Sequence, residues 1–431
     1  MLVSAITVIL VLSFLIFVHE LGHYLAARSV GVTVLEFSMG FPPKIFSKIV
    51  GKTEYILSLI PIGGYVRLLG QNIDDENPDE PGNYASKSVW RRLLILIAGP
   101  LMNLLFALIF MCLVIFLGQR VPAYYLNAPL INGIVTGSPA DKLNLRKNDL
   151  ILSVNGNGVE NWKAVQSQLQ KSSGPVIELR ISRDGAIIER DIDAAVFKNK
   201  ARIGWKISIE PVVGQISPNS PAEKSGLQTG DRILNVNGVE IKDWSQVSPS
   251  IQQTKGKDSQ ISILRDESKL EFSIKPQWNE TNSYWVLGIG SQTVHASENL
   301  VDSFSLGATQ MYLITGKTFE FLSRLVRGQE STKSMGGPIM IAQMVGQAAQ
   351  SDFSNLLFLV GYISLQFAVF NLLPIPALDG GHIFFLLVEK IKGSALPKGF
   401  RVSVQKAGFS LLLLLILYIS VQDGMRIFQG M

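Results

Sequence analysis

Residues 14–28 read FLIFVHELGHYLAAR and place two histidines and a glutamate within five residues at the end of an apolar run. Residues 2–18 are almost wholly apolar and carry no charge before His19, which predicts a membrane-spanning helix. A secretory signal peptide is the alternative, although the segment lacks the basic start that such peptides carry. Ionisable groups at membrane depth are costly and usually belong to a functional site. The stretch therefore predicts a membrane span with a reactive centre inside it.

The composition of the 431-residue chain predicts membrane spans joined to a large water-soluble part. Hydrophobic residues make up 47 % of the chain, yet charged residues still reach 17 %. The single cysteine, Cys112, lies in an apolar run and so supports neither a disulfide framework nor a cysteine zinc site. The net charge is only +5 and no long basic tract occurs, so we expect no nucleic-acid partner.

Three further apolar runs predict additional transmembrane helices, which makes four in total. Residues 93–118 and 355–378 are long enough for a hydrocarbon core of ~30 Å, which needs roughly 20 residues. Residues 407–421 are shorter but nearly free of charge. Lysine and arginine gather after the first and third spans, and these residues favour the cytoplasmic side. Both termini and residues 119–354 are therefore expected on the outer side of the membrane.

The outer region contains an internal repeat. Residues 137–162, GSPADKLNLRKNDLILSVNGNGVENW, align with residues 219–244, NSPAEKSGLQTGDRILNVNGVEIKDW. At two turns the second copy has glycine where the first has asparagine, namely Asn144 with Gly226 and Asn148 with Gly230. Asparagine tolerates the left-handed region well, so we expect positive φ at all four positions. The pattern predicts a duplicated, β-rich domain of about 85 residues.

A second outer feature is an apolar stripe at helical spacing within residues 303–328. The stripe consists of Phe304, Ala308, Met311, Thr315, Phe319, Leu322 and Val326. This amphipathic helix can lie in the outer membrane interface or pack on the repeats. We favour the interface, because the segment leads into the third span.

The HELGH motif predicts a metal centre. His19 and His23 lie four residues apart, so in a helix they project from the same face. Two neutral imidazoles at this spacing can bind one zinc ion, and Glu20 beside them is a potential general base. A buried cluster of this kind without a ligand would carry a large desolvation cost. We therefore expect one Zn²⁺ at this place.

Such a site needs a third protein ligand, and residues 370–382, FNLLPIPALDGGH, offer two candidates. Pro374 and Pro376 prevent the third span from continuing as a helix. Asp379 follows on unwound backbone, near the membrane side on which the histidines lie. We favour Asp379 as the ligand over His382, and Asp379 can also cap the helix that follows.

Two asparagines interrupt the apolar spans. Asn371 lies two helical turns before the predicted ligand, where it can contact a substrate carbonyl or make an interhelical hydrogen bond. Asn103 belongs to the second span, and we interpret it as packing between helices.

Residues 53–70, TEYILSLIPIGGYVRLLG, have two β-rich halves around a Pro-x-Gly-Gly turn, which predicts a β-hairpin. The hairpin is apolar enough to enter the bilayer from the cytoplasmic side, although it can also lie on the membrane surface. An unpaired edge could hold a substrate as an added strand. The substrate-contacting residues predicted here are Ile60, Pro61, Gly63, Gly64 and Tyr65.

Three motifs together resemble the intramembrane site-2 metalloproteases: HELGH in the first span, GPLMN (99–103) in the second and NLLPIPALDGG (371–381) after the third. The two repeats resemble PDZ domains of the circularly permuted bacterial kind, whose groove can bind a peptide or stay idle in a gate. The resemblance implies that His19, His23 and Asp379 bind zinc and that Glu20 is the base. It also implies that Asn371 contacts the substrate backbone and that residues 53–70 form a membrane-re-entrant hairpin.

The expected fold is a multi-pass α-helical membrane protein with four transmembrane helices, a membrane-associated β-hairpin and two β-rich permuted PDZ domains. The expected parts are residues 1–118, a first PDZ domain over 119–202, a second over 203–292, a connector over 293–354 and the last two spans over 355–431. The resemblance implies a protease of the bacterial inner membrane that acts in the envelope stress response. Its implied substrates are single-span membrane proteins, such as an anti-sigma factor after a first cleavage, and signal-peptide remnants, with the PDZ pair as a size-selecting gate.

Two other classes of function compete with this interpretation. A non-proteolytic PDZ scaffold could use a zinc-bound core for stability. A transporter is disfavoured, because the outer region is large and the spans are few. Proteolysis measured with and without a chelator separates the protease from both.

Overall fold

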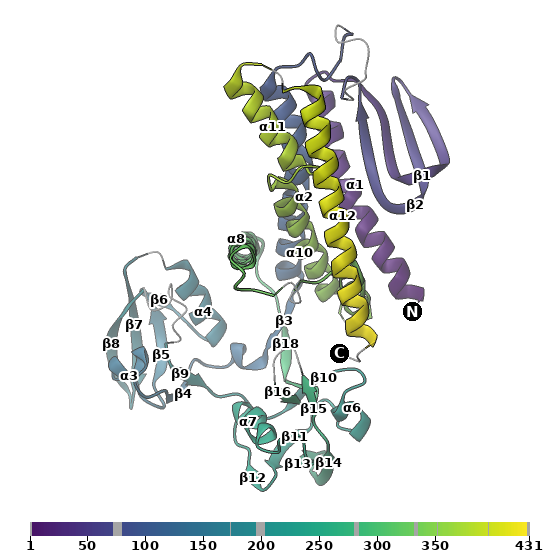
Figure 1. The fold of residues 1–431 in the computed structure, drawn as a ribbon. Helices are drawn as coiled ribbons and strands as arrows, with labels where there is room; N and C mark the ends of the chain where they lie inside the picture. The colour runs from purple at the N-terminus through teal and green to yellow at the C-terminus, as the bar shows by residue number, and fades with distance from the viewer. Residues whose placement is uncertain are drawn as a thin grey trace. The chain divides into compact units, whose positions relative to one another are not determined.

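The computed structural model describes residues 2–71, 80–172, 174–194, 203–279, 284–331, 335–350, 352–394 and 396–428 (Figure 1). The chain divides into two compact units. The helical unit comprises Met1–Gln119 and Ser297–Met431, and the repeat unit comprises Arg120–Ala296. The boundary expected between residues 202 and 203 borders on residues 195–202, which lie outside the described ranges.

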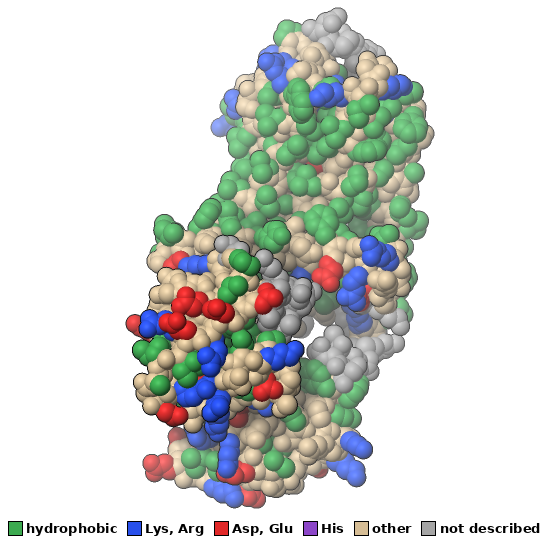
Figure 2. All heavy atoms as spheres, turned by 90° about the vertical axis from the view of Figure 1, so that its left-hand side faces the viewer, with side chains coloured by type: hydrophobic (Ala, Val, Ile, Leu, Met, Phe, Trp, Pro, Cys, Tyr) green, Lys and Arg blue, Asp and Glu red, His purple; other side chains and the backbone are tan. Residues whose placement is uncertain are grey.

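Four helices in the described ranges are long and apolar enough to cross a membrane. They are α1 (Leu2–Ser29), α2 (Val89–Leu117), α10 (Phe353–Leu372) and α12 (Lys398–Phe428). Each overlaps one of the predicted spans. Helix α10 ends at Leu372, short of the expected end at residue 378, and α12 extends well beyond residues 407–421 at both ends. Figure 2 shows hydrophobic side chains spread over this unit, with lysine and arginine gathered at one end of the apolar zone. The exposed apolar side chains include Leu101, Leu105, Leu411 and Leu414.

Helix α2 is the central element of the helical unit, since it packs against α1, α8 (Leu300–Val326), α10 and α11 (Asp379–Lys392). Small residues let these helices approach closely. A Cβ added to Gly22 would lie 2.2 Å from the carbonyl oxygen of Ala98, and one added to Gly307 would lie 3.0 Å from Sγ of Cys112. Short helix α9 (Pro338–Gln350) packs against α1, α10 and α12.

The chain between α10 and α11 turns sharply, and this turn positions the predicted third ligand. Helix α10 ends at Leu372, because Pro374 and Pro376 cannot continue it. A Cβ on Gly380 would lie 2.1 Å from the carbonyl oxygen of Leu373, and one on Gly381 would lie 2.4 Å from that of Ile375. The loop therefore folds tightly onto the first turn of α11, which begins at Asp379.

Strands β1 (Val34–Val50) and β2 (Thr53–Leu68) form a sheet that differs from the predicted hairpin (Figure 1). Segment 34–39 of β1 pairs with segment 64–68, from Val34 with Leu68 to Met39 with Gly64. The same segment also pairs with residues 54–57, from Glu36 with Glu54 to Met39 with Leu57.

Residues 54–57 pair on their other side with residues 46–49, so both of their edges are occupied. The expectation that the two halves of 53–70 pair with each other is therefore wrong, because segment 34–39 separates them. Among the described strands, segment 64–68 pairs on one side only, with segment 34–39, so the edge predicted for substrate pairing exists in this segment.

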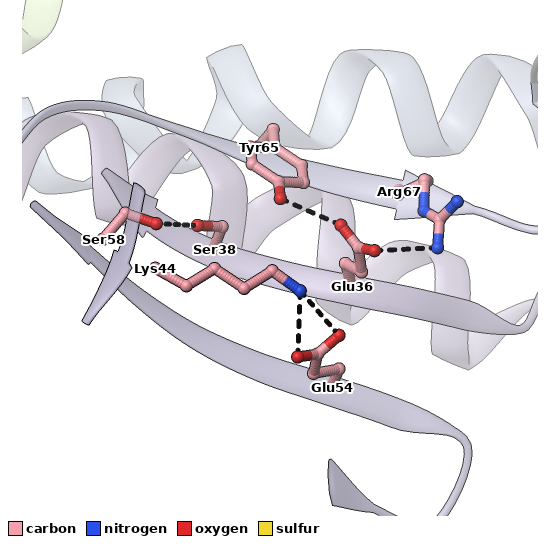
Figure 3. A network of polar contacts seen from close by, with 7 residues as sticks. All are labelled: Glu36, Ser38, Lys44, Glu54, Ser58, Tyr65 and Arg67. Atoms are coloured by element: carbon pink, nitrogen blue, oxygen red, sulfur yellow. Dashed lines mark hydrogen bonds and ion pairs between the residues drawn. The ribbon is translucent and has the colours of Figure 1, made fainter. Parts of the chain in front are cut away.

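Polar contacts tie the segments of this sheet together (Figure 3). Glu36 accepts a hydrogen bond of 2.9 Å from the Tyr65 hydroxyl and forms an ion pair of 2.8 Å with Arg67. The ammonium group of Lys44 lies 2.9 Å from a carboxylate oxygen of Glu54. Because each contact joins two segments that are adjacent in the sheet, these contacts help to fix the strand register.

Each repeat forms its own four-stranded sheet, with the order β6-β5-β7-β8 in the first and β12-β11-β13-β14 in the second. The first sheet contains β5 (Leu150–Val154), β6 (Asn157–Gly158), β7 (Val176–Arg183) and β8 (Ala186–Asp193). The second contains β11 (Arg232–Val236), β12 (Val239–Glu240), β13 (Ser259–Arg265) and β14 (Ser268–Ile274). Each sheet covers a separate apolar core, with Ile151 and Ile181 fully buried in the first and Ile233 and Ile263 in the second.

Shorter elements complete the repeat unit. The paired strands are β3 (Gln119–Pro122) with β18 (Thr293–Ala296), β4 (Ile131–Ile134) with β9 (Trp205–Ile207), β10 (Val213–Ile216) with β17 (Ile289–Ser291), and β15 (Gln277–Asn279) with β16 (Tyr284–Val286). The helices are η1 (Ala123–Leu126), α3 (Pro139–Lys142), α4 (Trp162–Lys171), α6 (Pro221–Ser225), η2 (Trp244–Gln246) and α7 (Val247–Gln252).

The duplication extends beyond the aligned sequences to their buried ion pairs. Arg183 Nε lies 2.7 Å from Asp149 Oδ1, and Arg265 Nε lies 2.7 Å from Asp231 Oδ1. The four predicted turn residues all have positive φ, namely 54° at Asn144, 70° at Asn148, 84° at Gly226 and 99° at Gly230. The expectation that asparagine replaces glycine in left-handed turns is therefore confirmed.

The amphipathic helix expected over 303–328 is present as α8. Its buried residues are Ser303, Gly307 and Met311, whereas Phe304, Phe319 and Val326 of the predicted stripe are exposed. Most of the large apolar side chains of the stripe therefore point away from the rest of the helical unit. Its placement in the membrane interface stays a prediction.

Candidate metal centre

The structure brings His19, His23 and Asp379 together. Helix α1 presents both imidazoles from one face, and the first residue of α11 presents the carboxylate. His19 Nε2 lies 3.1 Å from His23 Nε2 and 3.1 Å from Asp379 Oδ2, while His23 Nε2 lies 3.5 Å from Asp379 Oδ1. In the described part of the chain, these three residues are the group of ligand-type side chains whose atoms lie close enough for one metal ion.

The geometry of this group fits zinc. Two ligand atoms at ~2.0–2.1 Å from a tetrahedral zinc ion are about 3.3 Å apart, and the three separations lie around that value. The three side chains are only 12–17 % exposed. Asp379 Oδ2 is buried and makes no hydrogen bond of acceptable geometry, despite its short distance to His19 Nε2. A buried carboxylate oxygen without a hydrogen bond, beside two imidazoles, is suited to share a cation with them.

His382, the alternative ligand, is placed differently. It lines the same cavity, but its ring nitrogens lie 3.3 and 3.4 Å from Nε2 of Gln405, and it is not part of the three-residue group. The second proposed role for Asp379, a helix cap, is not observed. Leu378 occupies the N-cap position of α11, and no side chain caps that helix.

The His23 ring is oriented by α2. Its Nδ1 lies 2.8 Å from the carbonyl oxygen of Ile95, which can only accept a hydrogen bond. The hydrogen of the neutral ring therefore sits on Nδ1, and the Nε2 lone pair is free to face Asp379. This leaves Nε2 as the atom of His23 that could ligate a metal ion.

A cavity with a volume of about 310 Å³ opens beside the group. Its wall includes Glu20, Asn371 from the end of α10, and Tyr65 from the sheet edge. Tyr84 also lines the cavity, and burial raises the pKa of Tyr84 to about 12, so its phenol keeps its proton at neutral pH. The cavity thus combines the three candidate ligands with a carboxylate, two phenols, the His382 imidazole and the two amides of Gln71 and Asn371.

The predicted substrate contacts of residues 53–70 are only partly placed at this cavity. Tyr65 lines it, and a Cβ on Gly64 would lie 3.3 Å from Cγ of Glu20. Ile60, Pro61 and Gly63 are not among its lining residues: Ile60 pairs with Phe41, Gly63 packs on the Phe41 ring, and the carbonyl of Pro61 accepts a hydrogen bond from Ser13. Their contact with substrate stays a prediction.

Sequence reasoning missed several residues of the site, among them Tyr84, Ile95 and Gly99. A Cβ on Gly99 would lie 2.3 Å from Nε2 of His23 and 2.9 Å from Cε1 of His19. Asn103, interpreted as packing between helices, lies 3.3 Å from Nδ1 of His19 through its amide nitrogen. The sequence held one signal for Gly99 and Asn103. The two residues are four apart in the second span, and residues with this spacing lie on the same face of a helix.

Comparison with known proteins identifies the family. Residues 7–415 match the model of peptidase family M50. The chain is 30 % identical to the regulator of sigma E protease of Haemophilus influenzae, over 97 % of this chain and 98 % of the relative. It is also 30 % identical to the regulator of sigma-E protease RseP of Escherichia coli, over 95 % of each chain. A putative zinc metalloprotease of Clostridium acetobutylicum is 27 % identical over 97 % of each chain. The chain therefore belongs to peptidase family M50, the site-2 protease family, and it is a metalloprotease.

Proposed function

We propose that this protein is an intramembrane zinc metalloprotease that hydrolyses peptide bonds in the transmembrane segments of single-span membrane proteins. One observation carries the proposal. Two of the three candidate ligands, His19 and His23, lie in α1, and the third begins α11 after the turn that ends α10, so the group lies beside helices that can span a membrane. A site built in this way acts on a bond at membrane depth.

The proposed ligands are the Nε2 atoms of His19 and His23 and the carboxylate of Asp379, which hold one Zn²⁺. Three protein ligands leave a fourth position open, as in catalytic zinc sites. The ion supplies a Lewis acid that polarises a carbonyl and acidifies water.

Glu20 has the position of a general base, since its carboxylate lines the cavity one residue after His19. It takes a proton from a water molecule as the water oxygen adds to the peptide carbonyl carbon. It then passes the proton to the amide nitrogen as the C–N bond breaks. The reaction consumes one water and yields a carboxylate and an amine.

Substrate binding requires a local loss of helix, because a transmembrane helix hides its carbonyls in internal hydrogen bonds. Segment 64–68 supports this step, since it offers an edge next to the cavity to which an unwound segment can pair. Asn371 at the cavity wall can donate its amide hydrogens to a carbonyl of the bound segment.

We further propose that the two repeats are permuted PDZ domains that act as a size-selecting gate on the outer side of a bacterial inner membrane. The internal duplication and the two matching sheets support the domain assignment. The relatives named as regulators of sigma E protease support an anti-sigma factor, already shortened by another protease, as a partner. Signal-peptide remnants fit the same size rule, because they also lack a bulky outer domain.

Cleavage of a membrane-embedded reporter by the purified full chain in detergent tests the proposed chemistry. We expect cleavage that stops with a chelator, returns with added zinc and is absent in Glu20→Gln. Glu20→Gln keeps the size of the side chain and leaves the ligands in place, so it should retain zinc. Undiminished cleavage by Glu20→Gln would refute the assigned base, and a zinc-loaded wild type without any proteolysis would favour the scaffold.

A further inference from the structure

One face of α2 lies against the two histidines of the metal centre. It consists of Ile95, Gly99 and Asn103, which are spaced by four residues and so follow one another along the helix. Gly99 gives both rings room, and Ile95 accepts the hydrogen bond from His23 Nδ1 at 2.8 Å. The third member, Asn103, faces the other ring.

For His19, as for His23, the contacts of the ring show which of its two nitrogens carries the hydrogen. Its Nε2 faces His23 and Asp379, both at 3.1 Å, so Nε2 is the atom that serves as a metal ligand. The hydrogen of the neutral ring must then sit on Nδ1, and a buried N–H needs an acceptor. Nδ1 lies 3.3 Å from the side-chain amide of Asn103.

The Asn103 side chain can supply that acceptor. The residue is fully buried, and its Oδ1 makes no hydrogen bond, while Nδ2 is the amide atom that faces the ring. A half-turn of the amide about the Cβ–Cγ bond exchanges the two atoms and brings the oxygen to His19. The backbone of Asn103 is itself held, because its carbonyl accepts a hydrogen bond of 2.7 Å from the Ser364 hydroxyl of α10.

We propose that Asn103 is a positioning residue of the zinc site, whose amide oxygen accepts the Nδ1 hydrogen of His19 when the metal is bound. This inference rests on the proposed zinc ligands. With Ile95 it makes α2 the support that fixes the tautomer of both ligating histidines. Partners of this kind orient the ring, and their loss typically costs 10–100-fold in metal affinity.

Zinc affinity of the full chain in detergent, measured by competition with a chelator, tests the role. Asn103→Leu removes the acceptor at similar volume and should weaken zinc binding roughly 10–100-fold. Asn103→Asp keeps an acceptor oxygen at the ring and should bind zinc at least as tightly as the wild type. Gln366→Leu is the matched control, since it also replaces an amide in a spanning helix and removes a hydrogen bond of 3.2 Å to Thr318 of α8. Its affinity should be unchanged.

The outcomes separate this inference from the proposed function. If the wild type binds no zinc, the proposed function fails. If the wild type binds zinc and Asn103→Leu binds it equally well, only the role of Asn103 fails. If the leucine and aspartate variants are weakened alike, the amide acts as a donor and the inference is overturned.

A measurement on the wild type covers the case in which a variant does not fold. Nitrogen NMR of zinc-loaded protein with labelled histidine should show hydrogen on Nδ1 of His19. A metal-bound ring with hydrogen on Nε2 would overturn the inference.

Discussion

The carboxylate of Asp379 lies 3.1 Å from Nε2 of His19, although the two residues belong to opposite ends of the chain. One side chain comes from the first apolar helix, and the other follows the proline-terminated third one. The proposed metal centre would therefore form only when these parts of the helical unit are assembled. Metal binding and helix packing should stabilise each other, because an ion that binds the folded form alone shifts the folding equilibrium.

The identity of the third ligand gives a first prediction. Asp379→Asn keeps the size of the side chain but removes its charge. It should weaken zinc binding more than about 100-fold, because losing a residue that only hydrogen-bonds to a ligand already lowers metal affinity by 10–100-fold. His382→Gln should keep its zinc, because that ring lies against Gln405 and outside the three-residue group. Zinc content after equilibration with a chelator measures both variants. A reversed order of the two variants would assign the ligand to His382.

A second prediction concerns the close approach of Gly99 in α2 to the two histidine rings. Gly99→Ala would place a Cβ 2.3 Å from Nε2 of His23, so the ring must move away from the other ligands. Zinc affinity and cleavage should both fall by at least tenfold. Gly316→Ala is the control: it also lies within a helix, α8, and has open space around its Cβ position, so it should leave both quantities unchanged. Wild-type zinc affinity in Gly99→Ala would show that the rings do not depend on this glycine.

The repeats give a prediction about acid stability. Burial alone would raise the pKa of Asp149, but the hydrogen bonds from the Arg183 guanidinium and the Arg146 amide bring it below its ordinary value. A carboxyl whose pKa is depressed by folding stabilises the protein above the unfolded pKa, and this contribution is lost as pH falls through the folded pKa. The first repeat should therefore lose stability below about pH 4.

Hydrogen exchange of β5 and β7, corrected for intrinsic rates, measures this loss between pH 6 and pH 3. Asp149→Asn should cost about 2 kcal/mol near neutral pH and should flatten the acid dependence, because the charge-assisted bonds are gone. Glu189→Gln is the control, since its ion pair with Arg180 is exposed on both sides and should contribute little. An unchanged pH profile in Asp149→Asn would assign the acid dependence to other groups.

The gate gives a fourth prediction. Deleting residues 137–290 should allow cleavage of a reporter that keeps its bulky outer domain, while cleavage of a shortened reporter stays the same. The ratio of the two cleavage rates is the measurement. If the deleted protein cleaves the shortened reporter and still refuses the intact one, the repeats are not the size filter.

Local chemistry explains which parts of the structure could be predicted from sequence. The periodicity of His19 and His23, the prolines that end α10 and the positive φ at Asn144 each depend on a few neighbouring residues. The third ligand was predicted from the same turn, because proline and glycine there restrict the backbone.

Contacts between distant segments explain what was missed. Segment 34–39 lies between the halves of residues 53–70, and strand order depends on pairing across the sheet that no local pattern encodes. Asn103 was interpreted as helix packing for the same reason. Its contact with His19 appears only once α1 and α2 are docked.

X-ray absorption at the zinc edge of the purified, proteolytically active chain tests the central claim most directly. The account predicts one zinc per chain, with two imidazole nitrogens and at least one carboxylate oxygen at ~2.0–2.2 Å and no sulfur. Active protein without zinc, or a zinc whose shell contains the sulfur of Cys112 or a single imidazole, would contradict it.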